Sequence, residues 1–171
     1  MGEFLIIDGY NVINAWPDLI RLKEINFEHA RLKLIDILSD YAGFKGIKTI
    51  IVFDAHQVKG GLGHREEKEG LEIIYTPENI TADMVIEKLV SELSKKEEGT
   101  NIYVATSDKV EQDIILGKGA YRISSRELLL EVKEAKKQST GYYKQKNSRP
   151  YSLDSHLDEN IRIRLERMRR G

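Results

Sequence analysis

Short apolar runs alternate along this chain with stretches in which apolar residues recur at helical spacing. Runs typical of buried strands cover residues 4–7, 49–53, 71–75, 101–105 and, more briefly, 121–123. Helical spacing predicts helices over residues 27–41, from 81 to about 96, from 109 to 116, from 124 onward and over 152–170. Strands that alternate with helices predict an α/β protein with a mostly parallel central sheet and helices on both of its faces.

Capping residues support several of these helices. Asn26 is a predicted N-cap for the helix that follows it, with Gly43 near its end, and Thr81 is a predicted cap for the next one. Ser124 and Glu127 have the S-x-x-E spacing of a capping box.

Three segments carry no regular pattern. We expect a turn directly after residue 8, and a mobile surface loop over residues 58–70, which hold four glycines and the charged run HREEKE. Residues 136–150 are polar and basic without an apolar period, so we expect an irregular stretch there. The chain therefore divides into a domain over residues 1–135 and a basic linker and C-terminal helix over residues 136–171.

Composition narrows the class of protein. The 171 residues include no cysteine, so disulfides and thiolate metal sites are excluded and a reducing compartment fits. No signal-peptide pattern and no run of membrane-spanning length is present, which predicts a soluble cytoplasmic protein that does not bind a membrane.

The charges are unevenly distributed. Residues 133–171 hold 11 Lys and Arg against 5 Asp and Glu, whereas the remainder holds 16 against 23. An acidic body with a basic tail fits a cation site beside a surface for a polyanion, although a solvated terminal helix would show the same bias.

Carboxylates follow three of the predicted strands. Asp8, Asp54 and Asp108 each stand at a strand end, and parallel strands end at one edge of a sheet, where ligands bind in such folds. Asp83 lies in the first turn of the next helix, and Glu87 is one turn further on the same face. Crowded carboxylates repel unless a proton or cation joins them, and oxygen ligands suit Mg²⁺ or Mn²⁺.

Such a cluster fits metal-dependent hydrolysis of a phosphodiester. Each acid also has a simpler explanation, because acids after strands are common in turns and caps, and Asp108 in particular is a candidate N-cap for the helix that begins at Lys109. A phosphatase of the haloacid dehalogenase type needs a second aspartate where Tyr10 stands. A phosphoryl-accepting receiver domain fits Asp54, Thr106 and Lys109 but lacks its acidic pair. A dinucleotide-binding domain needs a glycine-rich first turn, which is missing.

The sequence motifs resemble those of one known family. The segments IIDGYNVINAWP, IIVFDAH with VKGG, IIYTPENITADMVIE and VATSD occur in this order over essentially the whole chain. Together they resemble the YacP-type NYN family of PIN-like ribonucleases. The resemblance implies a three-layer PIN-like fold and endonucleolytic cleavage of RNA, with messenger RNA cut in association with the ribosome.

The resemblance also assigns roles to residues. It implies that Asp8, Asp83, Asp108 and the motif asparagine Asn11 are catalytic, and that the metal ligands are Asp8, Asp54, Asp83, Glu87 and Asp108. Asn11 can orient Asp8 or contact a phosphate oxygen, because its amide both donates and accepts. Asp113 is a weaker candidate, and Tyr10 and Trp16 are expected to pack rather than to stack on bases.

An RNA substrate requires cations, and single strands also favour aromatic rings. The predicted RNA-binding residues are Lys59, Arg65, Lys136, Lys137, Tyr142, Tyr143, Lys144, Lys146, Arg149, Arg162 and Arg164. Their alternative role is to tie the last helix to the domain. The alternative function is a non-catalytic module of the same fold that binds RNA or the ribosome.

Overall fold

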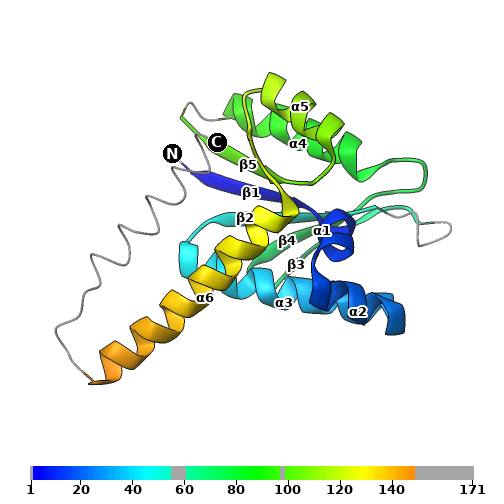
Figure 1. Cartoon of the computed structure of the whole chain (residues 1–171). Helices are drawn as coiled ribbons and strands as arrows, with labels where there is room; N and C mark the ends of the chain where they lie inside the picture. The colour runs from blue at the N-terminus through cyan, green and yellow to red at the C-terminus, as the bar shows by residue number, and fades with distance from the viewer. Residues whose placement is uncertain (1, 55–60, 97–98, 149–171) are drawn as a thin grey trace.

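The computed structural model of this chain describes residues 2–54, 61–96 and 99–148, with side chains as far as residue 141. The predicted final helix over residues 152–170 lies outside these ranges. The helices and strands of the described residues form a three-layer α/β structure with a central sheet between two sets of helices (Figure 1).

The sheet has six strands in the order β3-β4-β2-β1-β5-β6, and every neighbouring pair except β3 and β4 is parallel. The strands are β1 (Glu3–Asp8), β2 (Lys48–Phe53), β3 (His64–Lys68), β4 (Leu71–Tyr75), β5 (Asn101–Ala105) and β6 (Tyr121–Ile123). The middle of the central strand β1, residues 5–7, is buried, because neighbouring strands pair with both of its edges and helices cover both of its faces. The predicted mostly parallel α/β fold is therefore confirmed.

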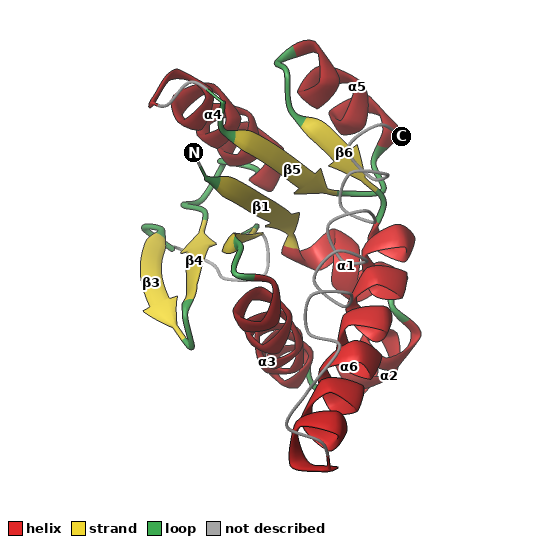
Figure 2. Ribbon diagram, turned by 90° about the vertical axis from the view of Figure 1, so that its left-hand side faces the viewer, coloured by secondary structure: helices red, strands yellow, loops and turns green. Residues whose placement is uncertain are grey.

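The helices pack on the two faces of this sheet (Figure 2). They are α1 (Gly9–Ala15), α2 (Pro17–Ile25), α3 (Phe27–Lys45), α4 (Ala82–Lys96), α5 (Lys109–Gly117) and α6 (Ser125–Ser148). Alternation along β1 separates two apolar cores. Leu5 and Ile7 join the core under α1, α2, α3 and α6, whereas Ile6 joins the core under α4 and α5.

The segment after Asp8 is helical, although a turn was expected there. Asp8 caps α1, and Pro17 begins α2 at a position where its missing N–H costs no hydrogen bond. Gly9 is required here for space, since a Cβ on this residue would lie 2.4 Å from Cε1 of Phe53. The tight approach of α1 to β2 thus depends on the absence of a side chain.

The expectation of a mobile loop over residues 58–70 is wrong for its second half. His64–Lys68 is the antiparallel edge strand β3, joined to β4 through the two-residue turn Glu69-Gly70. Both turn residues have positive φ, 54° and 82°, as the hairpin turn that matches strand twist requires. The strand is charged because it lies at the sheet edge, where its side chains meet water.

The basic stretch after residue 135 is also helical rather than irregular as far as Ser148, because α6 continues through it without a break. The helix starts agree with prediction. The Asn26 Oδ1 accepts from the Glu28 N–H at 2.8 Å, the Thr81 Oγ1 from the Met84 N–H at 3.2 Å and the Ser124 Oγ from the Glu127 N–H at 3.1 Å. The end of α3 lies beyond Gly43, at the left-handed Gly46.

Candidate metal centre

The carboxyl edge of the sheet brings acidic side chains together from three elements. β1 ends at Asp8, and the parallel strand β5 ends beside it, so the segment that leads into α5 starts at the same edge. Helix α4 follows β4 and packs over β1, which places its first turn and Asp83 above the end of that strand.

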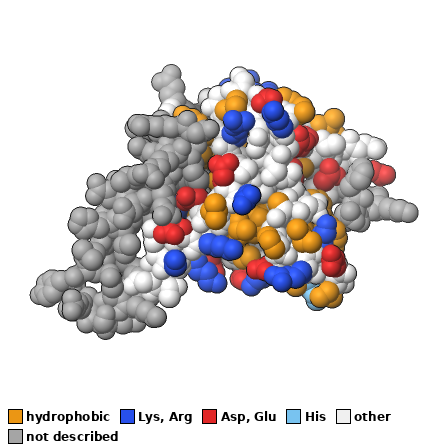
Figure 3. All heavy atoms as spheres, in the orientation of Figure 1, with side chains coloured by type: hydrophobic (Ala, Val, Ile, Leu, Met, Phe, Trp, Pro, Cys, Tyr) orange, Lys and Arg blue, Asp and Glu red, His pale blue; other side chains and the backbone are white. Residues whose placement is uncertain are grey.

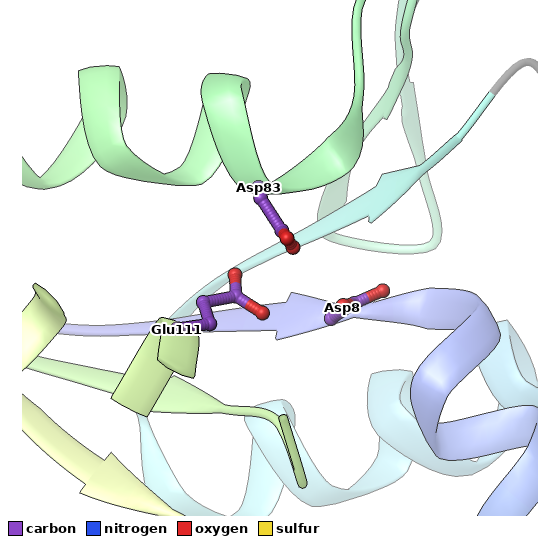
Figure 4. Close-up of side chains that lie close together, drawn as sticks. All are labelled: Asp8, Asp83 and Glu111. Atoms are coloured by element: carbon purple, nitrogen blue, oxygen red, sulfur yellow. The ribbon is translucent and has the colours of Figure 1, made fainter. Parts of the chain in front are cut away.

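Asp8, Asp83 and Glu111 point toward one another from β1, α4 and α5 (Figure 4). Each offers one carboxylate oxygen, and these three oxygens all lie within 4.8 Å of one another. Asp8 and Asp83 are half-buried, and Glu111 is only 2% exposed.

The environment of Asp8 favours its neutral form. Burial raises the pKa of this carboxyl to about 6, against an opposing hydrogen bond from the Asn11 N–H, and the charges of Asp83, Asp54 and Asp108 raise it further. The N–H of Asn11 donates to the Asp8 Oδ1 at 3.5 Å, so this capping hydrogen bond is long.

Glu111 is the most unusual member of the cluster. Neither of its carboxylate oxygens has a hydrogen-bond partner of good geometry among the described residues. Burial, the nearby Asp83 and the Asp8 charge raise the Glu111 pKa to about 9, and Thr106 opposes this weakly. A buried carboxylate without a partner is costly unless it holds a proton or a cation.

The donor set fits a divalent cation. Three carboxylate oxygens converge, one of them orphaned and buried, and oxygen ligands of this kind suit Mg²⁺ or Mn²⁺. The geometry therefore supports a cation-binding site at this edge.

Asp108, which was expected in the shared site, has a different role in the structure. It is the N-cap of α5, and its Oδ1 accepts from the Val110 N–H at 3.0 Å and the Glu111 N–H at 3.5 Å. The side chain is exposed and is not one of the three converging acids. The expectation that Asp8, Asp83 and Asp108 converge is thus corrected, and Glu111 takes the third place.

Glu111 was not predicted as a site residue, although the sequence carries a signal for it. Glu111 stands four residues before Ile115, and these two are the buried residues of α5. An acid on the apolar stripe of a short helix is a sign of a functional carboxylate. The D-x-x-E spacing from Asp108 hides this sign, because it also describes a capping box.

The remaining predicted acids lie around the cluster. The Asp54 Oδ2 accepts from the Ala82 N–H at the start of α4, at 3.3 Å, and the charge of Asp54 contributes to the raised pKa of Asp8. Glu87 is half-buried on α4, one turn beyond Asp83, and is not part of the converging group. Asp113 is exposed on α5.

Asn11 anchors the edge of the site through its side chain. The Asn11 Oδ1 accepts from the Ser107 N–H and from the Ser125 Oγ–H, both at 2.8 Å. Ser125 is fully buried; its N–H donates to the Ser107 Oγ at 3.2 Å, and its carbonyl accepts from the Trp16 Nε1 at 2.7 Å. The motif asparagine therefore joins α1 to the turn after β5 and to the start of α6.

Of the predicted RNA-binding residues, only Arg65, Lys136 and Lys137 have side chains that the structure describes. Arg65 on β3 is paired with Glu72, and the exposed Lys136 lies at a cavity of about 570 Å³ between α3 and α6, with Lys137 beside it in sequence. Tyr142, Tyr143, Lys144 and Lys146 belong to α6, where only the backbone is described, and Lys59, Arg149, Arg162 and Arg164 lie outside the described residues. On the face shown in Figure 3, the Lys and Arg side chains of the described residues alternate with Asp and Glu rather than forming one patch.

A mostly parallel sheet with helices on both faces and converging carboxylates at its carboxyl edge fits a nuclease-like PIN fold. The chain belongs to the family of the YacP-like NYN domain, whose model matches residues 5–170. The receiver and phosphatase alternatives are set aside by this membership.

Similar proteins come from Bacillus subtilis. The chain is 42% identical over 169 residues to an uncharacterized protein, YacP, of strain 168, covering 99% of this chain and 98% of that protein. The crystal structure of Rae1 (YacP) superposes with a TM-score of 0.72 at 42% identity, covering 98% of this chain and 95% of that one. The crystal structure of a tryptophan-to-leucine mutant of that protein gives 0.75 at 40% identity, with 91% and 89% covered. In the part of this chain that the structure describes, no helix is both long and apolar enough to cross a membrane.

Proposed function

We propose that this protein is a divalent-metal-dependent endoribonuclease that uses Mg²⁺ or Mn²⁺ to hydrolyse phosphodiester bonds inside RNA chains. Its substrate in this proposal is messenger RNA, cut in association with the ribosome. The RNA and the ribosome are inferred from family resemblance, whereas the hydrolytic chemistry is inferred from the carboxyl edge of the sheet.

One observation carries the proposal, namely the convergence of Asp8, Asp83 and Glu111, which is buried and has no hydrogen-bond partner among the described residues. A protein gains nothing in stability from three carboxylates held within 4.8 Å of one another, one of them excluded from water. Such an arrangement is explained when the acids hold a cation that the reaction uses.

In this proposal the residues around the acidic cluster have different roles. Asp8, Asp83 and Glu111 hold the cation, which supplies Lewis-acid activation of water and stabilises charge on phosphate oxygens. Asp54 and Asp108 add negative charge around it, which strengthens cation binding. Asn11 fixes the turn after β5 and thereby the position of α5 and Glu111.

The test uses a labelled messenger RNA in Mg²⁺ or Mn²⁺. In one arm the messenger is being translated by ribosomes, and in the other arm it is free of ribosomes. Asp8→Asn, Asp83→Asn and Glu111→Gln are compared with the natural protein, and Asp113→Asn is the matched control because this acid is exposed on the same helix as Glu111. We expect metal-dependent internal cuts that disappear in the first three variants and persist in the control.

The outcomes separate the alternatives. Cleavage that is equal in the natural protein and in all three variants contradicts the proposal. Ribosome co-sedimentation without any cleavage favours the non-catalytic module. Cleavage that requires ribosomes supports the proposed association with the ribosome. Cleavage that is equally efficient on RNA without ribosomes contradicts this association and leaves the proposed nuclease activity in place.

A further inference from the structure

Aromatic side chains form a row along the carboxyl edge of the sheet, on the face covered by α3. The ring centroids are 5.9 Å apart for His64 and Tyr75, 5.5 Å for Tyr75 and Phe53, 5.3 Å for Phe53 and Tyr10, and 5.2 Å for Tyr10 and Phe27. The row runs from the edge strand β3 across β4 and β2 to α1. His64 is exposed, and Tyr75 and Tyr10 are half-buried, so part of the row faces solvent.

Arg31 of α3 stands over the inner end of this row. Its Nη1 donates to the Tyr10 hydroxyl at 3.1 Å, and this side chain has no carboxylate partner among the described residues. Arg21 and Arg65, in contrast, are paired with Asp18 and Glu72.

The guanidinium of Arg31 also acts on the neighbouring ring. Burial and the charges of Glu66 and Glu28 raise the pKa of Tyr75, and the positive charge of Arg31 opposes that rise. The guanidinium therefore lies within electrostatic reach of Tyr75 as well as Tyr10. Arg31 is half-buried and positioned by a hydroxyl instead of being neutralised by an acid.

This group lies next to the acidic cluster but on the opposite face of the sheet. Tyr10 is the second residue after Asp8, and the Phe53 ring that contacts it immediately precedes Asp54. The converging acids come from the side of α4 and α5, whereas Arg31 comes from α3. A strand of RNA that crosses the end of β1 can therefore meet both.

We propose that Arg31, positioned by the Tyr10 hydroxyl, binds a backbone phosphate of single-stranded RNA, with Tyr75 and His64 forming an adjoining surface for a base. The inference rests on the proposed function for the identity of the ligand as RNA. It adds a phosphate site that the basic tail does not supply.

The chemistry of the group supports this ligand. A guanidinium offers a planar fork of N–H donors that matches a phosphate, and it loses little entropy when another group already orients it. Among the described residues Arg31 forms no ion pair with a carboxylate, whereas Glu66 pairs with His64 at 3.1 Å, and Glu66 and Glu28 lie within electrostatic reach of Tyr75. The bases of single-stranded RNA stack on aromatic side chains, and this stacking does not depend on which base is present.

The experiment measures binding without cleavage. Fluorescence anisotropy of a short labelled single-stranded RNA is followed in EDTA at several salt concentrations. Arg31→Ala is compared with Arg21→Ala, the matched control, since Arg21 is an exposed arginine on the neighbouring helix α2. Melting curves of each variant establish that it is folded.

We expect Arg31→Ala to weaken binding about tenfold and to reduce the salt slope by about 0.7, the value for one phosphate contact on a single strand. The control is expected to change neither. Arg31→Lys keeps the charge and hence the salt slope, but loses part of the affinity because an ammonium lacks the fork. Tyr10→Phe is expected to behave like Arg31→Lys, since it removes only the hydroxyl that holds the guanidinium.

Two results would overturn the inference. One is an Arg31→Ala variant that matches the control in both affinity and salt slope. The other is a loss of affinity with an unchanged slope in Arg31→Ala, which indicates a purely structural role. RNA that binds through Arg31 but is never cleaved leaves the inference in place and rejects the proposed nuclease instead.

Discussion

A carboxylate oxygen of Glu111 lies within 4.8 Å of a carboxylate oxygen of Asp8, although the two residues come from α5 and β1. The first of these acids is buried and has no hydrogen-bond partner in the part of the chain that the structure describes, and the second is the N-cap of α1. This relationship defines the candidate metal centre, and it leads to predictions that treat the two carboxyl groups differently.

Replacement of Glu111 by Gln is expected to reduce cleavage and cation affinity by about 100-fold or more, because even partners of metal ligands contribute roughly 10- to 100-fold. Titration of Mn²⁺ by calorimetry and single-turnover cleavage measure the two effects. Asp113→Asn, on the exposed side of the same helix, should leave both unchanged. A Glu111→Gln variant with normal Mn²⁺ affinity would remove Glu111 from the site.

The metal-free protein is expected to lose stability as pH rises. The pKa of Glu111 rises from 4.5 to about 9 on folding, and that of Asp8 from 3.8 to about 6. The folded state therefore holds more protons than the unfolded state within these windows, so the free energy of unfolding decreases as pH increases through them.

Urea unfolding in EDTA at pH 5, 7 and 9 measures this slope. Glu111→Gln should flatten it and should raise the stability at pH 9 by on the order of 1 kcal/mol, since a neutral amide needs no proton to remain buried. Saturating Mg²⁺ should restore stability to the natural protein, by about 2.7 kcal/mol at a hundred times the Kd. A flat profile in EDTA contradicts the assignment.

Gly9 is expected to tolerate no side chain. A Cβ would meet the Phe53 ring at 2.4 Å, so Gly9→Ala should lower the free energy of unfolding by about 1–3 kcal/mol through overpacking. Gly43→Ala is the matched control, because this helical glycine has open space around it and the substitution should stabilise by about 0.5–1 kcal/mol. Equal effects of the two changes would contradict the packing argument.

Ser125 is expected to stabilise the junction of α1, the turn after β5 and the start of α6. Ser125→Ala removes the donor to Asn11 and leaves one fewer hydrogen bond at a fully buried junction, at a cost of about 1–3 kcal/mol. Trp16, the single tryptophan, bonds to the carbonyl of the same residue, so its fluorescence reports on this junction during unfolding. Thr140→Ala, exposed on α6, serves as the control and should change stability by less than about 0.5 kcal/mol.

The sequence by itself determined five of the six strands and most helix starts, because apolar periodicity and caps are local. The strand over residues 101–105 and the caps Asn26 and Thr81 depend on neighbours in the chain, and the structure agrees with them. The two short helices after Asp8 escaped prediction, since α1 is stabilised by a glycine packed on a distant ring. The strand β3 also escaped, because its charges reflect an edge position that only strand order defines.

The acidic centre was determined only in part. Parallel strands end at one edge, so Asp8 could be placed there from sequence alone, and Asp83 followed from the start of a helix. The choice between Asp108 and Glu111 depended on how α5 is rotated over the sheet. Asp108 is the N-cap of α5, and Glu111 lies on the buried side of this helix, facing the other two acids. The rotation of α5 about its own axis is decided by tertiary packing, not by the local sequence pattern.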